Sequence, residues 1–166
     1  MDLTKVSFPK NFPEEVNVVI EIPQNSIGLK YEVDKESGAV FVDRFLTAPM
    51  FYPANYGFVP NTLGGDGDPI DVLVISPFAI HPGIVITSRV IGVLIMEDEG
   101  GMDEKIIAVP ASSVSKEYEN IKEITDLPEL TVKQIKHFFE RYKDLEKNKW
   151  VKVTGFKSAS EAFEII

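Results

Sequence analysis

Three aspartates lie within six residues of one another, where a glycine-rich turn meets an apolar run. Asp66, Asp68 and Asp71 stand in the sequence Asp-Gly-Asp-Pro-Ile-Asp, and the mainly apolar residues 70–75 complete the segment. Carboxylates this close repel one another unless a cation lies among them, and oxygen ligands favour Mg²⁺, Mn²⁺ or Ca²⁺. An EF-hand is excluded because Pro77 occupies the position of its bidentate glutamate. The segment is a candidate divalent-metal site, with a polar turn as the alternative.

A second acidic segment spans residues 97–105, between apolar runs at 90–96 and 106–109. The pattern is typical of an acidic hairpin loop, for which solvated surface charge is the ordinary explanation. If the flanking strands pair, however, the two acidic loops meet in one hollow whose negative charge requires bound cations. The aspartates that would converge there are Asp66, Asp68, Asp71, Asp98 and Asp103.

Basic residues occur at unexpected positions beside these acids. Lys30 and Glu32 alternate along a predicted strand and therefore share one of its faces. Arg44 lies in an otherwise apolar run, and Lys105 ends the second acidic segment. Each of these charges, taken alone, is explained better as a solvated surface charge than as part of a site.

The composition excludes several kinds of site and partner. The chain has no cysteine, which excludes disulfides and thiolate chemistry, and the isolated His81 and His137 give little support to a zinc site or a histidine-based triad. A net charge of −9 argues against nucleic acid as a partner. No apolar run approaches the ~20 residues of a membrane span, and the N-terminus lacks a secretory pattern. We therefore expect a cytoplasmic protein with no membrane partner.

Hydrophobic periodicity predicts one α+β domain over residues 1–166. Tyr142 falls on the apolar stripe at 132–145 that predicts an amphipathic helix, where a core aromatic is the ordinary explanation, and a short closing helix is expected at 158–163. The aromatic, proline-containing stretch 51–58 fits neither periodicity, and Gly92 is the expected site of a bulge. Short, mainly antiparallel strands favour a closed or partly closed barrel. The predicted strands are 16–22, 29–33, 39–45, 70–75, 84–96, 106–109 and 150–154.

These segments together resemble the soluble inorganic pyrophosphatases of family I, and in particular their bacterial branch. The family's Asp-x-Asp-Pro-x-Asp run is present at 66–71, and the resemblance covers nearly the whole chain. It extends to 52–57, to 98–99 with Asp103 and Lys105, and to 142–143 followed by 149–151. It implies a five-stranded OB-like antiparallel β-barrel flanked by helices, with the active site at one mouth. It also implies a homo-oligomer, usually a hexamer in bacteria.

The activity that this resemblance implies is hydrolysis of inorganic pyrophosphate to two orthophosphates. Several Mg²⁺ ions per site would activate a water, Mn²⁺, Zn²⁺ or Co²⁺ could substitute, and Asp68 would be the general base. The implied metal ligands are Asp66, Asp71, Asp98 and Asp103, with Asp71 shared between two ions. The implied phosphate-binding residues are Lys30, Arg44, Tyr56, Lys105, Tyr142 and Lys143. The implied supporting residues are Glu21, Glu32 and Tyr52.

Two other functions remain open from the residues alone. A non-enzymatic OB-type module could hold Ca²⁺ structurally with the acidic loops. It would leave four basic residues without a role: Lys30, Arg44, Lys105 and Lys143. An OB-type nucleic-acid binder would need a basic groove with stacking aromatics, which the net charge opposes.

Overall fold

The computed structural model describes residues 1–65 and 67–166, so that Asp66, a predicted metal ligand, lies outside the described residues. The helices are α1 (Glu129–Arg141) and α2 (Ala159–Ile165), with short 3-10 turns at Leu3–Lys5 and Ile124–Asp126. The strands are β1 (Glu15–Ile22), β2 (Leu29–Val33), β3 (Val40–Phe45), β4 (Asn55–Phe58), β5 (Asp71–Val74), β6 (Val85–Asp98), β7 (Gly101–Met102), β8 (Lys105–Pro110) and β9 (Val151–Lys157).

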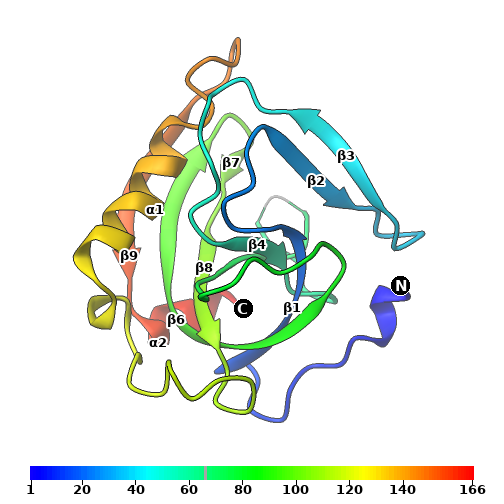
Figure 1. Cartoon of the computed structure of the whole chain (residues 1–166), viewed down its shortest axis with the longest axis vertical. Coiled ribbons are helices and arrows are strands. Elements are labelled where there is room, and N and C mark those ends of the chain that lie inside the picture. The colour runs from blue at the N-terminus through cyan, green and yellow to red at the C-terminus, as the bar shows by residue number, and fades with distance from the viewer. Residues whose placement is uncertain (66) are drawn as a thin grey trace.

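The main sheet has seven strands, and five of them hydrogen-bond in a closed circuit. β1 pairs with β4, β4 with β5, β5 with β8, β8 with β6, and β6 again with β1. The long β6 makes this possible because its first half pairs with β1 and its second half with β9. Figure 1 shows the strongly curved β6 running along the lower part of the circuit and then up its left side.

Two glycines allow close approaches within this sheet. A Cβ atom on Gly57 of β4 would collide with the carbonyl oxygen of Val19 in β1. Gly92 lies at the register shift in β6, as predicted for a bulge, and has φ of +154°. A Cβ atom there would collide with the side chain of Ile124, so that the bend in β6 depends on glycine.

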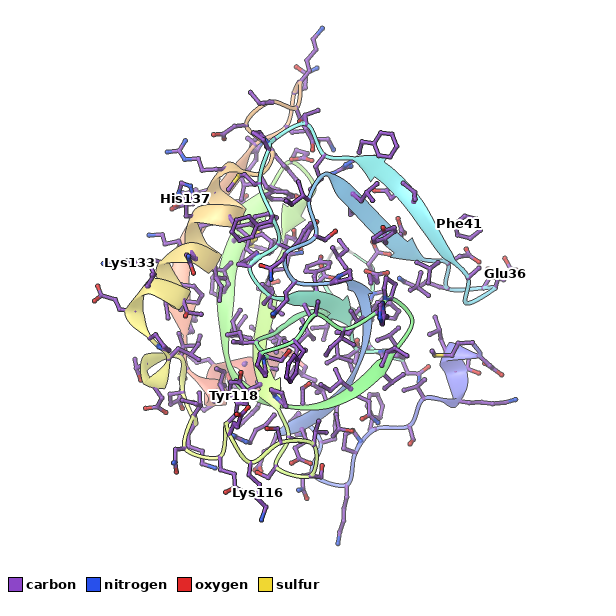
Figure 2. The ribbon with its side chains drawn as sticks, in the orientation of Figure 1. Glu36, Phe41, Lys116, Tyr118, Lys133 and His137 are labelled. Carbon is purple, nitrogen blue, oxygen red and sulfur yellow. The ribbon has the colours of Figure 1, made fainter. Side chains whose placement is uncertain are left out.

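β2 and β3 form a separate two-stranded sheet, here called the ribbon, which projects from the main sheet (Figure 1). β3 is largely exposed on both faces, and Phe41 and Phe45 are 56% and 75% exposed. Figure 2 shows the side chain of Phe41 pointing away from the body of the protein. The backbone of β3 is therefore held mainly by β2 and by its end contacts, rather than by core packing.

The core on one side of the sheet is covered by α1. Ile135, Phe138 and Phe139 of this helix are buried against a cluster that includes Leu94 and Met96 of β6. α2 contributes Ala162 to a second buried cluster, and its start at Ser158 is fixed by a capping box with Glu161. None of the helices in the described part of the chain is long and apolar enough to cross a membrane.

The α+β class and most predicted elements are confirmed, but the structure corrects three expectations. β4 was not predicted, because its residues lie in an aromatic segment without alternation. The sheet is not wholly antiparallel, since β5 and β8 run parallel. They are not joined by a hairpin, so their relative direction is not fixed by a short connection. Finally, α1 ends at Arg141, and Leu145 of the predicted stripe is exposed.

Candidate active site

A cavity of about 270 Å³ collects nearly all the predicted site residues. Its walls come from the ribbon, β4, the start of β5, the β6–β7 hairpin, and the C-terminal end of α1 with the segment that follows it. The lining residues are Lys30, Arg44, Tyr52, Tyr56, Asp68, Asp71, Asp98, Glu99, Asp103, Lys105, Phe139, Tyr142, Lys143 and Lys149. Acidic, basic and phenolic side chains thus face one another across a small volume.

The parallel pairing of β5 with β8 places an ion triad in the wall of this cavity. Asp71 and Lys105 are register partners at the start of the two strands. Lys105, only 3% exposed, donates hydrogen bonds from Nζ to carboxylate oxygens of both Asp71 and Asp103. Burial disfavours the charged amine, but the two carboxylates overcome it and raise the pKa of Lys105. Burial raises the pKa of Asp103, against the opposing effect of Lys105.

The β6–β7 hairpin presents a second pair of acids, Asp98 and Glu99, to the segment after α1. Lys143 Nζ lies 2.7 Å from Asp98 Oδ2 and 3.3 Å from Glu99 Oε1. Lys149 Nζ lies 2.7 Å from Glu99 Oε1, and the Trp150 amide donates to the same carboxylate. Burial opposes ionisation of Glu99, yet the hydrogen bond from Lys149 and the backbone amides lower its pKa to about 2. Glu99 therefore fixes the segment after α1 to the hairpin.

Three phenols line the apolar side of the cavity. The ring of Tyr52 packs against Tyr56 and Phe138, with centroids 5.8 and 4.7 Å apart, and Phe138 stacks on Tyr142. Burial raises the pKa of all three tyrosines, so they stay protonated near neutral pH. Their hydroxyl groups can thus donate hydrogen bonds to an anion in the cavity.

The ribbon supplies the opposite basic wall through register partners Lys30 and Arg44. Lys30 Nζ lies 3.1 Å from Asp43 Oδ2. Arg44 Nη2 lies 3.7 Å from Glu146 Oε1, in the segment after α1. Both cations are partly exposed, and both can therefore reach a ligand in the cavity without unfolding of the ribbon.

An adjoining cavity of about 110 Å³ shares Lys30, Tyr56, Asp68 and Asp71 with the first. It adds a buried carboxylate, Glu21, which accepts from the Val33 amide at 2.8 Å and lies 3.2 Å from Lys35 Nζ. Burial raises the pKa of Glu21. The predicted supporting residues Glu21 and Glu32 line this cavity, whereas Tyr52 lines the first.

The donor set suits a hard divalent cation, since the acids that face the cavity offer oxygen ligands. Within residues 1–65 and 67–166, no three acidic or histidine side chains are grouped closely enough to hold one metal ion. Lys105 lies between Asp71 and Asp103, and Lys143 is paired with Asp98. The amines of these lysines thus occupy positions beside the carboxylates that a cation would take.

The structure brings together ten of the eleven predicted site residues and leaves only Asp66 outside its described part. Four further charged residues border the two cavities or pair with their walls: Lys35, Glu99, Glu146 and Lys149. Another charged residue lies within two positions of each of them, so charge alone could not distinguish them. Glu99 and Lys149 do lie in segments that resemble the family, and this resemblance is the sequence signal that could have identified them as site residues.

Comparison with known proteins gives one consistent result. A family model described as inorganic pyrophosphatase matches residues 18–166. An inorganic pyrophosphatase of Gluconobacter oxydans is 60% identical over 166 residues, all of this chain and 95% of that protein. One of Escherichia coli K12 is 58% identical over 98% of this chain and 92% of that protein. A crystal structure of an inorganic phosphatase from Anaplasma phagocytophilum has a TM-score of 0.95 and 52% identity, covering 98% of this chain and 95% of that one.

Replacing Lys105 with methionine should expose the repulsion between Asp71 and Asp103 that the amine now balances. Removing one partner of a buried ion cluster costs about 3 kcal/mol, so we expect Lys105→Met to lower the free energy of unfolding by that order in EDTA. Added Mg²⁺ should raise the melting temperature of the variant more than that of the unmodified protein. Equal Mg²⁺ shifts in thermal unfolding of the two proteins would contradict this interpretation of the triad.

Proposed function

This chain belongs to the inorganic pyrophosphatase family and is a hydrolase of pyrophosphate, and we propose that it acts through several Mg²⁺ ions with Asp68 as general base. The observation that carries the proposal is the single cavity in which four aspartates face the four basic side chains that are proposed to bind phosphate. The aspartates are Asp68, Asp71, Asp98 and Asp103. The basic residues are Lys30, Arg44, Lys105 and Lys143.

The chemical difficulty of the reaction is electrostatic. Pyrophosphate carries several negative charges near neutral pH, and these repel an attacking hydroxide. Bound divalent cations neutralise phosphate oxygens and lower the pKa of a water toward neutrality, with Mn²⁺, Zn²⁺ or Co²⁺ as substitutes for Mg²⁺. In our proposal Asp66, Asp71, Asp98 and Asp103 hold these ions.

Asp68 is proposed as the group that accepts the proton of the attacking water. Its carboxylate lines both cavities, next to the proposed metal ligand Asp71. A carboxylate can act as the base only where it reaches the water directly or through one further water. The position of Asp68 where the two cavities join supports this role.

The basic and phenolic residues are proposed to bind the phosphate oxygens. Lys30 and Arg44 approach from the ribbon, Lys143 from the segment after α1, and Lys105 from the start of β8. Protonated Tyr56 and Tyr142 add neutral donors, because burial raises their pKa. Such preorganised donors act where charge accumulates on the leaving phosphate, and each is worth about 3 kcal/mol by analogy with other donors of this kind.

The proposal covers the whole of residues 1–166 as one domain. β6 hydrogen-bonds both to β1 and to β9, which supports this interpretation. We further propose that the circuit of five strands corresponds to the OB-like barrel that the family resemblance implies. A cytoplasmic location remains a prediction.

The first test is release of orthophosphate from pyrophosphate by the purified chain. We expect release in Mg²⁺, none above background in excess EDTA, and recovery when Mg²⁺ is restored, because the acidic cavity repels the substrate without cations. A colorimetric phosphate assay, run in parallel with ATP and polyphosphate, measures both activity and selectivity. Metal binding without phosphate release would instead favour the structural Ca²⁺ module.

Asp68→Asn should lower turnover by about 10²- to 10⁴-fold, the usual contribution of a general base. The amide keeps the size of the side chain but does not take up a proton at neutral pH. Mg²⁺ affinity by calorimetry and the melting temperature should change little, and Asp2→Asn, at the exposed N-terminal turn, serves as the matched control. Turnover close to that of the unmodified protein would refute the assignment of the base.

We also propose a homo-oligomer, with a hexamer as the expected state. The exposed phenylalanines Phe41 and Phe45 of the ribbon support it, because large apolar side chains are often covered at an interface between subunits. Light scattering should give a mass near six times the 18.5 kDa of one chain. Phe41→Ser should lower that mass at micromolar protein concentration. A monomeric mass for the unmodified protein would contradict the proposal.

A further inference from the structure

Arg44 has an acidic neighbour, Glu146, that is neither a proposed metal ligand nor a proposed phosphate ligand. Its Nη2 atom lies 3.7 Å from Oε1 of Glu146, and the side chain of Glu146 is only 12% exposed. This distance is too long for a hydrogen bond, so the contact is one of charge. A carboxylate largely removed from water, beside a proposed phosphate ligand, requires an explanation.

The segment that carries Glu146 is held firmly on the far side of the cavity. The Glu146 amide donates to the Lys143 carbonyl at 2.9 Å, and the Lys149 amide donates to the Glu146 carbonyl at 3.4 Å. Glu99 of the β6–β7 hairpin binds both the Lys149 amine and the Trp150 amide. The backbone of Glu146 is thus fixed by contacts that do not involve the ribbon.

Arg44, by contrast, lies on a strand with little support from the core. Phe41, Val42 and Phe45 of β3 are all more than half exposed. An arginine on such a strand loses side-chain entropy when it is ordered around a ligand, and a fixed acidic neighbour reduces that loss before the ligand arrives. Glu146 therefore links the ribbon to the body at the point where Arg44 faces the cavity.

The contact between Arg44 and Glu146 leaves N–H donors of the guanidinium available for a ligand. Arg44 Nε and Glu146 Oε1 are both buried, and neither has a hydrogen-bond partner among the described residues. A guanidinium has five N–H donors in one plane. A carboxylate near one terminal nitrogen restricts that plane while the other donors remain able to bind phosphate oxygens.

We propose that Glu146 is a positioning residue that holds the guanidinium of Arg44 in the orientation that binds a phosphate group of the substrate. The proposal rests on the proposed function, because it takes Arg44 as a phosphate ligand. Glu146 acts only through Arg44 and does not contact the substrate. In this role Arg44 holds a phosphate group in the bound substrate as well as in the transition state, so loss of Glu146 should weaken substrate affinity and raise KM more than it lowers kcat.

The test is a double-mutant cycle that measures binding of imidodiphosphate, a non-hydrolysable pyrophosphate analogue, by calorimetry in excess Mg²⁺. Glu146→Gln keeps the shape of the side chain and removes its charge, and should weaken binding about five- to tenfold, as coupled neighbours do. In an Arg44→Met background the same change should have almost no further effect. In steady-state assays Glu146→Gln should raise KM by a similar factor and change kcat less than about twofold.

Controls separate positioning from a general loss of structure. Glu119→Gln makes the same chemical change on an exposed residue far from the cavity and should alter neither affinity nor KM. Figure 2 shows the labelled neighbours of Glu119, Lys116 and Tyr118, at the opposite end of the molecule from the ribbon. If Glu146→Gln lowers the melting temperature markedly, Glu146→Asp, which keeps the charge, replaces it in the cycle and should give a smaller loss of affinity.

Equal losses of affinity from Glu146→Gln in the unmodified protein and in the Arg44→Met variant would overturn the proposal, since Glu146 would then act independently of Arg44. So would unchanged affinity in the single variant. If the unmodified protein neither binds imidodiphosphate nor releases phosphate from pyrophosphate, the proposed function itself fails, and this inference fails with it. If the unmodified protein binds imidodiphosphate but the substitutions at Glu146 and Arg44 show no coupling, only the positioning role of Glu146 fails.

Discussion

Like charges confined to a small cavity must be balanced, and this constraint organises the centre of the molecule. Asp71 and Asp103 lie on either side of a nearly buried amine from Lys105, and Asp98 is balanced by Lys143. Single carboxylates in such surroundings would be costly to ionise. Asp71 and Asp98 are therefore kept near cations from distant parts of the chain, whereas Asp103 lies two residues from Lys105.

Backbone pairing determines which charges meet. Asp71 and Lys105 are neighbours because β5 and β8 run parallel with these two residues in register. A slip of one residue would turn one of the two side chains to the opposite face of the sheet. The buried apolar residues that follow, such as Val72 and Ile106, fix the register because they must remain in the core. The hydrophobic core thus specifies the electrostatics of the site.

Much of the site could be predicted from sequence, and the failures have physical causes. Each acidic segment is short and lies at the end of a strongly apolar run that predicts a strand. Pairing of these strands was therefore enough to predict that the two segments converge. β4 was missed because Asn55 and Gly57 interrupt the apolar pattern. Asn55 is nevertheless fully buried and accepts from the Gln24 and Ile80 amides, while Gly57 allows close packing on β1. Long-range polar contacts of this kind leave no periodic signal.

The same limitation explains why Glu99 and Glu146 received no role from the sequence. Each is one acid among several, and its importance depends on which cation it meets across the cavity. Once folded, the site has every proposed phosphate-binding amine or guanidinium beside a carboxylate. When metal ions and a polyanion bind, the carboxylates would pair with the metal ions and the basic groups with the polyanion. The charges of the protein are already balanced before this exchange of partners. Because much of the ordering and desolvation of Lys105 and Lys143 is completed on folding, less of the binding free energy is needed to organise them when substrate arrives.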